Sequence, residues 1–289
     1  MRKLLLKKEN FYFITVLIIV AVLGLAFGSF YKLHDKFWSH SILTMLVFVF
    51  AISHGIINKG TKNTLTFLAL SFAISFAAEF IGVNFGYFFG GGYSYSDLLG
   101  PKILGVPFLV ILMWAALIYV AYALSEHILD FRITKNISKK DKFYLAFFSS
   151  IVAALAAVAW DFVLDPLAVT MKWWTWQTAG VYFGIPASNF IGWLIVVFLA
   201  VFLFKMLFEK EHEETETRYD YAPALCYFLL YLSIIGLALE TRQPIFILIG
   251  FITMFPFISI ILVRYFTMKT KAPHLFKHKH GKVKGSEDG

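Results

Sequence analysis

The sequence predicts an all-α integral membrane protein with about eight transmembrane helices, formed by a single polytopic domain over residues 1–268. Hydrophobic residues make up 59% of the chain and charged residues only 15%, a composition outside the range of soluble domains. Apolar runs of about 20 residues, the length that crosses roughly 30 Å of hydrocarbon, recur along the chain.

Each apolar run is long enough for one crossing. The runs cover residues 11–30, 39–57, 65–89, 103–124, 143–164, 187–204, 222–239 and 245–263. The first follows a basic start, as in a signal peptide, but it is too long and lacks a small-residue cleavage motif, so we expect a retained helix. Residues 269–289 form a basic tail that we expect to be cytoplasmic and disordered.

The basic residues predict the orientation. With both termini in the cytoplasm, 21 of the 26 Lys and Arg fall in cytoplasmic segments, as the positive-inside rule requires. We therefore expect a multi-pass protein of the cell membrane. The net charge of +8 follows from the same bias and requires no nucleic-acid partner. The single Cys226 excludes an internal disulfide and a Cys-rich metal cluster, and the sequence predicts no metal site.

Residues 65–124 and 143–204 carry the same pattern: an acid within an apolar helix, an aromatic pair in the next loop, a Gly-x-Pro, and a Trp seven residues later. In the first copy the acid is Glu79, the aromatic pair is Tyr93 and Tyr95, the Gly-x-Pro is 105–107 and the tryptophan is Trp114. In the second copy these are Asp161, Trp174 and Trp176, 184–186 and Trp193. Both acid-bearing helices are predicted to run from inside to outside. Helices three and four and helices five and six would thus form a parallel internal repeat, whose two halves meet in one pocket at the outer side.

The acids are the first candidates for chemistry, because an ionisable group in lipid costs about 2.5–3.5 kcal/mol on insertion scales. Glu79 and Asp161 lie inside predicted helices, and Asp165 follows Asp161 by four residues on the same helical face. Pro166 is expected to end that helix. A helix-ending turn would also explain Asp165, and a polar tie between helices would explain Asp161 or Glu79.

Polar and aromatic residues near the acids are candidates for substrate binding. They are Asn84, Tyr87, Tyr93, Tyr95, Trp114, Trp160, Trp174, Trp176, Tyr182, Asn189 and Trp193. An aromatic belt at the membrane interface would explain several of them equally well. Their combination with amides and acids at one depth favours a cavity that is apolar, aromatic and acidic.

Several motifs resemble those of the membrane-integral carotenoid biosynthesis proteins, most of all the carotenoid 1,2-hydratases, including archaeal bisanhydrobacterioruberin hydratases. The motifs include Glu79-x-x-Gly82, Trp160-Asp161, Asp165-Pro166, Trp174-x-Trp176 and Asn189-Phe190-x-Gly192-Trp193. The resemblance implies a hydro-lyase that adds water to the terminal double bond of an acyclic C40 or C50 carotenoid, without a cofactor. It also implies a substrate from the lipid phase and other carotenoid-pathway enzymes as partners.

Hydration of such an alkene needs a proton donor, stabilisation of a tertiary carbocation and a positioned water. We hypothesise that Asp161 donates the proton and Glu79 orients water or stabilises the cation, with Asp165, Asn84 and Asn189 as the supporting polar shell; the two main roles could be exchanged. A carotenoid end-group cyclase of the lycopene type would use the same acid and cation. A non-enzymatic carotenoid- or lipid-binding scaffold, or a transporter, could also carry paired acids in a duplicated bundle.

Overall fold

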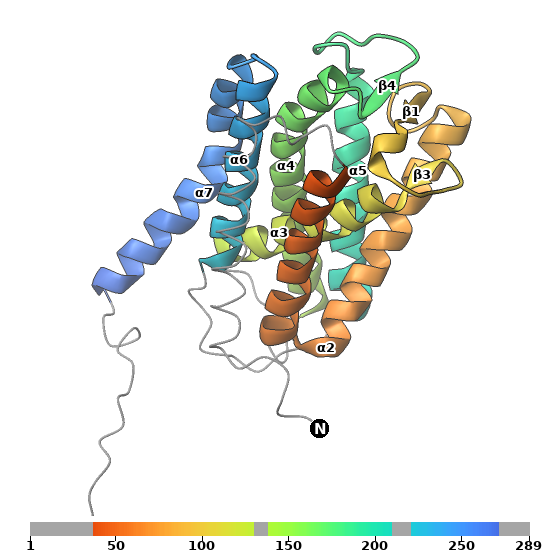
Figure 1. The fold of residues 1–289 in the computed structure, drawn as a ribbon. Coiled ribbons are helices and arrows are strands. Elements are labelled where there is room, and N and C mark those ends of the chain that lie inside the picture. Colours follow the sequence, from red (N-terminus) through yellow and green to blue (C-terminus); the bar gives the residue numbers. More distant parts are fainter. Residues whose placement is uncertain (1–36, 130–137, 210–220, 272–289) are drawn as a thin grey trace, which may run out of the picture.

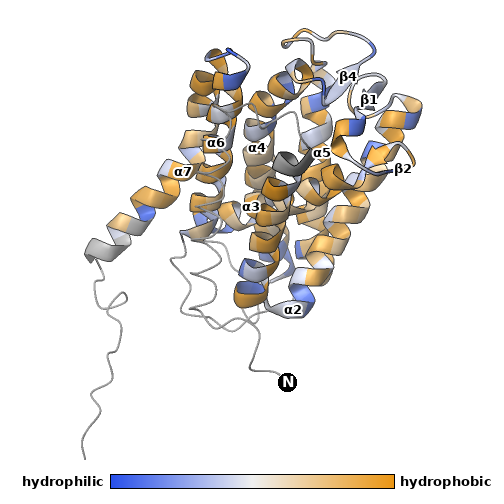
Figure 2. Ribbon diagram, viewed as in Figure 1, coloured by the Kyte–Doolittle hydropathy of each residue, from blue (hydrophilic) through white to orange (hydrophobic). Residues whose placement is uncertain are grey.

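The computed structural model describes residues 37–129, 138–209 and 221–271, most of which are helical (Figure 1). Within these ranges six helices are long and apolar enough to cross a membrane. They are α2 (Phe37–Phe85), α3 (Phe108–Leu129), α4 (Lys139–Thr170), α5 (Ala187–Leu203, extended by the π-helical turn η4, Phe204–Phe208), α6 (Ala222–Glu240) and α7 (Ile245–Lys271). Hydrophobic residues cover most of each helix (Figure 2). The predicted helical, membrane-type fold is confirmed.

Helix α2 consists of two helices joined at Gly60, whose φ of 79° and ψ of 158° are not helical. The chain turns back at this point (Figure 1). The two halves approach so closely that a Cβ atom at Gly55 would lie 2.5 Å from Cγ2 of Thr64. The halves correspond to the predicted spans 39–57 and 65–89. The predicted span 11–30 lies outside the described residues, so the count of eight spans stays a prediction.

The second half of α2 ends at Phe85 rather than at the expected residue 89. Gly86 has a φ of 71°, and its N–H donates to the carbonyl of Gly82 over 3.0 Å. This left-handed glycine caps the helix and turns the chain toward the loop.

Helix α3 begins at Phe108 rather than at residue 103, because the preceding Gly-x-Pro segment forms a hairpin. Strand β2 (Lys102–Ile103) pairs with β3 (Val106–Pro107). Leu104 and Gly105 between them have φ values of 51° and 86°. Two turn residues with positive φ match the tight turns that follow the twist of a hairpin.

A second two-stranded ribbon joins the two aromatic loops, which the all-α prediction did not include. Strand β1 (Tyr93–Tyr95) pairs antiparallel with β4 (Trp174–Trp176), so that Tyr93 faces Trp176 and Tyr95 faces Trp174. We call this end of the bundle the ribbon end. The register brings the aromatic pairs of the two predicted repeat units together, as a two-fold axis between the strands would do. The repeat itself remains a prediction.

Pro166 does not end its helix, contrary to the expectation, because α4 continues to Thr170. A proline lacks the N–H that would bond the carbonyl four residues earlier, here that of Phe162. The hydroxyl of Tyr182 donates to this carbonyl over 2.9 Å. A side chain from the following loop thus replaces the missing backbone donor, and Asp165 lies inside the helix instead of at its end.

Helix α4 is central, since it contacts α3, α5, α6 and α7. Its alanine-rich stretch is buried, including Ala153, Ala154, Ala156 and Ala157. Small side chains let neighbouring backbones approach closely. This acid-bearing helix therefore packs inside the bundle. At the C-terminal side, α7 continues to Lys271, beyond the expected start of the tail at residue 269; residues 272–289 lie outside the described part.

Candidate active site

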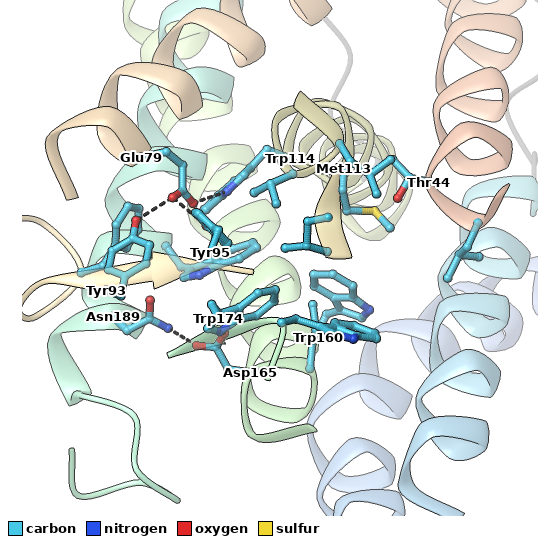
Figure 3. A pocket seen from close by; sticks show the side chains of 18 of the residues that line it. Thr44, Glu79, Tyr93, Tyr95, Met113, Trp114, Trp160, Asp165, Trp174 and Asn189 are labelled. Atoms are coloured by element: carbon cyan, nitrogen blue, oxygen red, sulfur yellow. Dashed lines mark hydrogen bonds between the residues drawn. The ribbon is translucent and has the colours of Figure 1, made fainter. Parts of the chain in front are cut away.

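A cavity of about 130 Å³ lies at the ribbon end, among α2 to α6 and the two ribbon strands (Figure 3). It is lined mainly by apolar and aromatic side chains. Ten residues predicted from the sequence line it: Glu79, Tyr93, Tyr95, Trp114, Trp160, Asp165, Trp174, Trp176, Asn189 and Trp193. The chain therefore gathers most of the predicted site around one space, with acids from two different helices.

Glu79, on the second half of α2, accepts hydrogen bonds from three side chains. The hydroxyls of Tyr93 and Tyr95 donate to Oε2 over 2.5 and 2.7 Å, and the indole Nε1 of Trp114 donates to Oε1 over 2.7 Å. The side chain is buried, with the whole residue 4% exposed. Three donors aimed at both carboxyl oxygens form the arrangement that stabilises a carboxylate anion and fixes its position.

The two tyrosines remain donors over the physiological pH range. Burial, followed by the negative charge of Glu79, raises the pKa of Tyr93 and of Tyr95 well above the usual value near 10. Both hydroxyls therefore keep their protons at neutral pH. The ribbon holds them in place, because Tyr93 and Tyr95 flank the central residue of β1 and point to the same side of the strand.

Asp161 and Asp165, one turn apart on α4, share the amide of Asn189 from α5. Its Nδ2 donates to Oδ2 of Asp161 over 2.9 Å and to Oδ2 of Asp165 over 2.5 Å. The indole of Trp174 donates to the second oxygen of Asp165 over 3.1 Å. Asp165 lines the cavity, whereas Asp161 is fully buried behind it. Oδ1 of Asp161 has no hydrogen-bond partner in the described part of the chain.

The ribbon connects the two acidic groups. Tyr95, which binds Glu79, contacts Trp174, which binds Asp165, with ring centroids 5.8 Å apart and the rings nearly perpendicular. In Figure 3, Tyr95 and Trp174 lie between the two acids. The pairing of β1 with β4 thus sets the position of the Glu79 group relative to the aspartate pair.

Stacked indoles close another side of the cavity. The rings of Trp114 and Trp193 stack at a centroid distance of 3.6 Å, and Trp160 packs edge-on against Trp193 at 6.1 Å. The Nε1 atoms of Trp160 and Trp176 are buried without a hydrogen-bond partner among the described residues. Buried donors of this kind are normally satisfied by ordered water or a ligand.

Besides Asp161, three predicted residues do not line the cavity. Asn84 is exposed and donates to the carbonyls of Phe80 and Leu104, so it fixes the β2–β3 hairpin. Tyr87 is 69% exposed beyond the end of α2. Tyr182 supports α4 through its hydroxyl; burial and the charges of the two aspartates raise its pKa to about 12. Helical spacing alone could not reveal that the chain turns away at Gly86.

The prediction also missed residues. Thr44 from the first half of α2 and Ser233 from α6 contribute to the cavity wall, and neither belongs to the repeated pattern. Neither the first half of α2 nor α6 carries a motif that indicates a site. Within the described residues, no group of three or more His, Cys, Asp or Glu side chains could hold a metal ion.

A buried ionic cluster lies at the opposite end of the bundle and was not predicted. Lys59 forms ion pairs with Glu126 and Glu209 over 2.6 and 2.8 Å, and Lys205 does so over 3.0 and 3.1 Å. Tyr122 donates to Glu209 over 2.6 Å. Lys59 and Lys205 lie just beyond the predicted spans 39–57 and 187–204, so both were expected in cytoplasmic loops. In the structure Lys205 is fully buried in η4, where its partners compensate its charge.

Comparison with known proteins identifies the relatives of the chain. The family described as carotenoid biosynthesis protein matches residues 37–257. A bisanhydrobacterioruberin hydratase from Haloarcula japonica is 32% identical over 138 residues, which are 47% of this chain and 43% of that protein. The match therefore spans less than half the length of this relative. No solved structure matches the chain.

Proposed function

Because this chain belongs to the carotenoid biosynthesis protein family, we propose that it hydrates the terminal double bond of an acyclic carotenoid and so produces a tertiary alcohol. The observation that carries the proposal is the presence of two separate acidic groups, Glu79 and the Asp161–Asp165 pair, beside one aromatic cavity. The similarity to a protein named bisanhydrobacterioruberin hydratase supports the same reaction class. We propose an acyclic C40 or C50 carotenoid as the substrate.

The aspartate pair is the proposed source of the proton. Two carboxylates that share one amide repel each other in an apolar site, and a proton held by the pair removes that repulsion. Asp165 lines the cavity and Asp161 lies behind it. We therefore assign the donated proton to Asp165 and give Asp161 the role of holding the pair, which modifies the sequence-based hypothesis that Asp161 itself donates.

In the proposed reaction, Glu79 and the aromatic rings stabilise the cation, and buried indole donors position the water. An indole face beside a cation contributes about 0.5–2 kcal/mol, more when water is excluded, and three tryptophans, Trp114, Trp160 and Trp193, form one wall. A carboxylate fixed by three donors adds electrostatic stabilisation without having to reorganise. The unpaired Nε1 atoms of Trp160 and Trp176 are donors available to a water molecule.

The proposed reaction conserves all atoms. The proton of Asp165 bonds to the less substituted alkene carbon, and the π electrons leave a cation at the tertiary carbon. The oxygen of water bonds to that carbon, and the surplus proton of the new hydroxyl passes to Glu79. Transfer of a proton from Glu79 back to the aspartate pair through water restores both groups. The net change is the addition of one water molecule to the substrate.

The test is expression of the full chain in a lycopene-accumulating host, followed by mass analysis of the pigments, and repeated with an acyclic C50 precursor if lycopene is untouched. We expect a product heavier by one water. Asp165→Asn and Glu79→Gln should abolish it. Asp97→Asn is the matched control, because Asp97 is an exposed carboxylate of the same region that pairs with Lys102 outside the cavity.

Other outcomes would overturn the proposal in distinct ways. An isomer of the substrate would indicate a cyclase, since an internal double bond would have replaced water. An unchanged pigment pool with both substrates, in the presence of folded protein, would indicate a scaffold or transporter. Full activity of both Asp165→Asn and Glu79→Gln would contradict the assigned residues even if hydration itself occurred.

A further inference from the structure

An apolar groove of about 680 Å³ adjoins the candidate cavity. Ile42, Met45 and Val49 of the first half of α2 line one side of it, and Ile103 and Phe108 line the other. The atoms that face the groove are apolar. These five side chains are each between 41% and 51% exposed, so the groove opens along the outside of the bundle.

The groove and the cavity share two wall residues. Leu99, at the end of the short 3-10 helix η3 (Asp97–Leu99), and Leu109, in the first turn of α3, line both spaces. Both are buried, at 4% and 8% exposure. Two leucine side chains therefore belong to the wall between the open groove and the cavity that holds the acids.

We propose that the groove binds the polyene body of the substrate, while the end group passes between Leu99 and Leu109 into the cavity. This inference rests on the proposed function and adds a binding site to it. The occupant is a linear hydrocarbon, because a charged or hydrogen-bonding ligand would leave its polar groups without partners against the apolar wall, which costs several kcal/mol.

The dimensions of the groove suit part of a long chain. The α2 residues on its wall run from Ser41 to Val49, which corresponds to about 12 Å of helix. The hydrocarbon core of a bilayer is about 30 Å thick. The extended chain of an acyclic C40 or C50 carotenoid is longer than the groove. A polyene that fills the groove therefore extends beyond it into lipid, and only one end of the molecule reaches Glu79 and Asp165.

The test measures binding separately from turnover. In an Asp165→Asn background, which should prevent reaction, full-length protein is purified in detergent from a lycopene-accumulating host, and the pigment retained per protein is measured by absorbance. Met45→Trp and Val49→Trp fill the groove. Leu155→Trp is the matched control, because Leu155 is an aliphatic residue of α4 with 47% exposure that lines neither space.

We expect each groove variant to retain about tenfold less pigment, since the loss of roughly 60 Å² of apolar contact weakens binding by that factor. Leu155→Trp should retain as much as the parent. Met45→Ala, which removes bulk instead of adding it, should retain pigment nearly as well. Size-exclusion profiles and unfolding temperatures of all four variants show whether a loss of pigment reflects misfolding.

Two results would overturn the groove assignment. One is unchanged pigment retention in both Met45→Trp and Val49→Trp. The other is efficient disulfide formation between Val49→Cys and Val16→Cys in a Cys226→Ala background without carotenoid, which would show that the chain's own residues 11–30 cover the groove. A third result would separate the two proposals. If pigment binding depends on the groove but the chain without substitutions makes no hydrated product, the groove assignment stands and the proposed hydration is wrong.

Discussion

Removal of the Tyr95 hydroxyl is the sharpest probe of the Glu79 group. In Tyr95→Phe the ring keeps its contact with Trp174, and Tyr93 and Trp114 still donate to Glu79. The change deletes one hydrogen bond of 2.7 Å to the carboxylate. Hydrogen bonds to charged groups contribute about 1.5–3 kcal/mol. If Glu79 acts on the cation or the water, turnover should fall roughly tenfold to 150-fold.

The assay compares the hydrated fraction of pigment at equal amounts of folded protein. Tyr227→Phe is the control, because Tyr227 is fully buried and its hydroxyl donates to the carbonyl of Ala156 over 2.6 Å, away from the cavity. Both variants should lower the unfolding temperature to a similar small extent, but only Tyr95→Phe should lower turnover. Equal activity of the two variants would refute the role given to Glu79.

Three further predictions concern the rest of the bundle. Lys205→Met leaves buried carboxylates with too few partners and should reduce the free energy of unfolding by about 3–5 kcal/mol, measured in detergent against the exposed control Leu207→Ala. Burial alone would raise the pKa of Glu209, but the positive charges of Lys205 and Lys59 outweigh burial and lower this pKa below the usual 4.5. Because the pKa is lower in the folded state, the stabilisation is complete above about pH 4.5 and is lost as pH falls through the folded pKa. The unfolding temperature should therefore drop on acidification, and it should drop less in a Glu209→Gln variant. Tyr182→Phe should lower the free energy of unfolding by about 1 kcal/mol in the natural sequence. The loss should be smaller in a Pro166→Ala background, where a backbone N–H can again donate to the Phe162 carbonyl. Equal losses in both backgrounds would contradict the conclusion that the Tyr182 hydroxyl replaces the donor that Pro166 lacks.

The sequence was sufficient to predict the helical membrane fold and the acids, tyrosines and most of the tryptophans that line the cavity, because both depend on strong local signals. Apolar length identifies the helices, and the paired pattern around Glu79 and Asp161 selected the residues that meet. The pairing of Tyr93 with Trp176 could not be predicted, since it joins segments about eighty residues apart without any short-range pattern. The pattern suggested two halves of a pocket but not the ribbon between them.

Errors in the prediction arose where backbone geometry overrides composition. The hydrophobic run through Phe89 suggested a longer helix, but Gly86 adopts a left-handed conformation and ends it. Pro166 suggested a helix end, but a hydroxyl from Tyr182 supplies the missing donor. Hydropathy cannot anticipate either event, because the first depends on the backbone conformation of Gly86 and the second on a hydroxyl from the following loop.

The buried ionic cluster has a consequence for how the chain is inserted during synthesis. Lys59 is made first, and it gains a partner when Glu126 arrives at the end of α3. Lys205 and Glu209 come later, one helical turn apart, and they already pair with each other. The cluster can therefore grow by two neutral pairs in chain order. The segment that ends α5 then brings no net charge of this cluster to the assembling bundle, because the four-residue spacing lets Lys205 and Glu209 pair with each other.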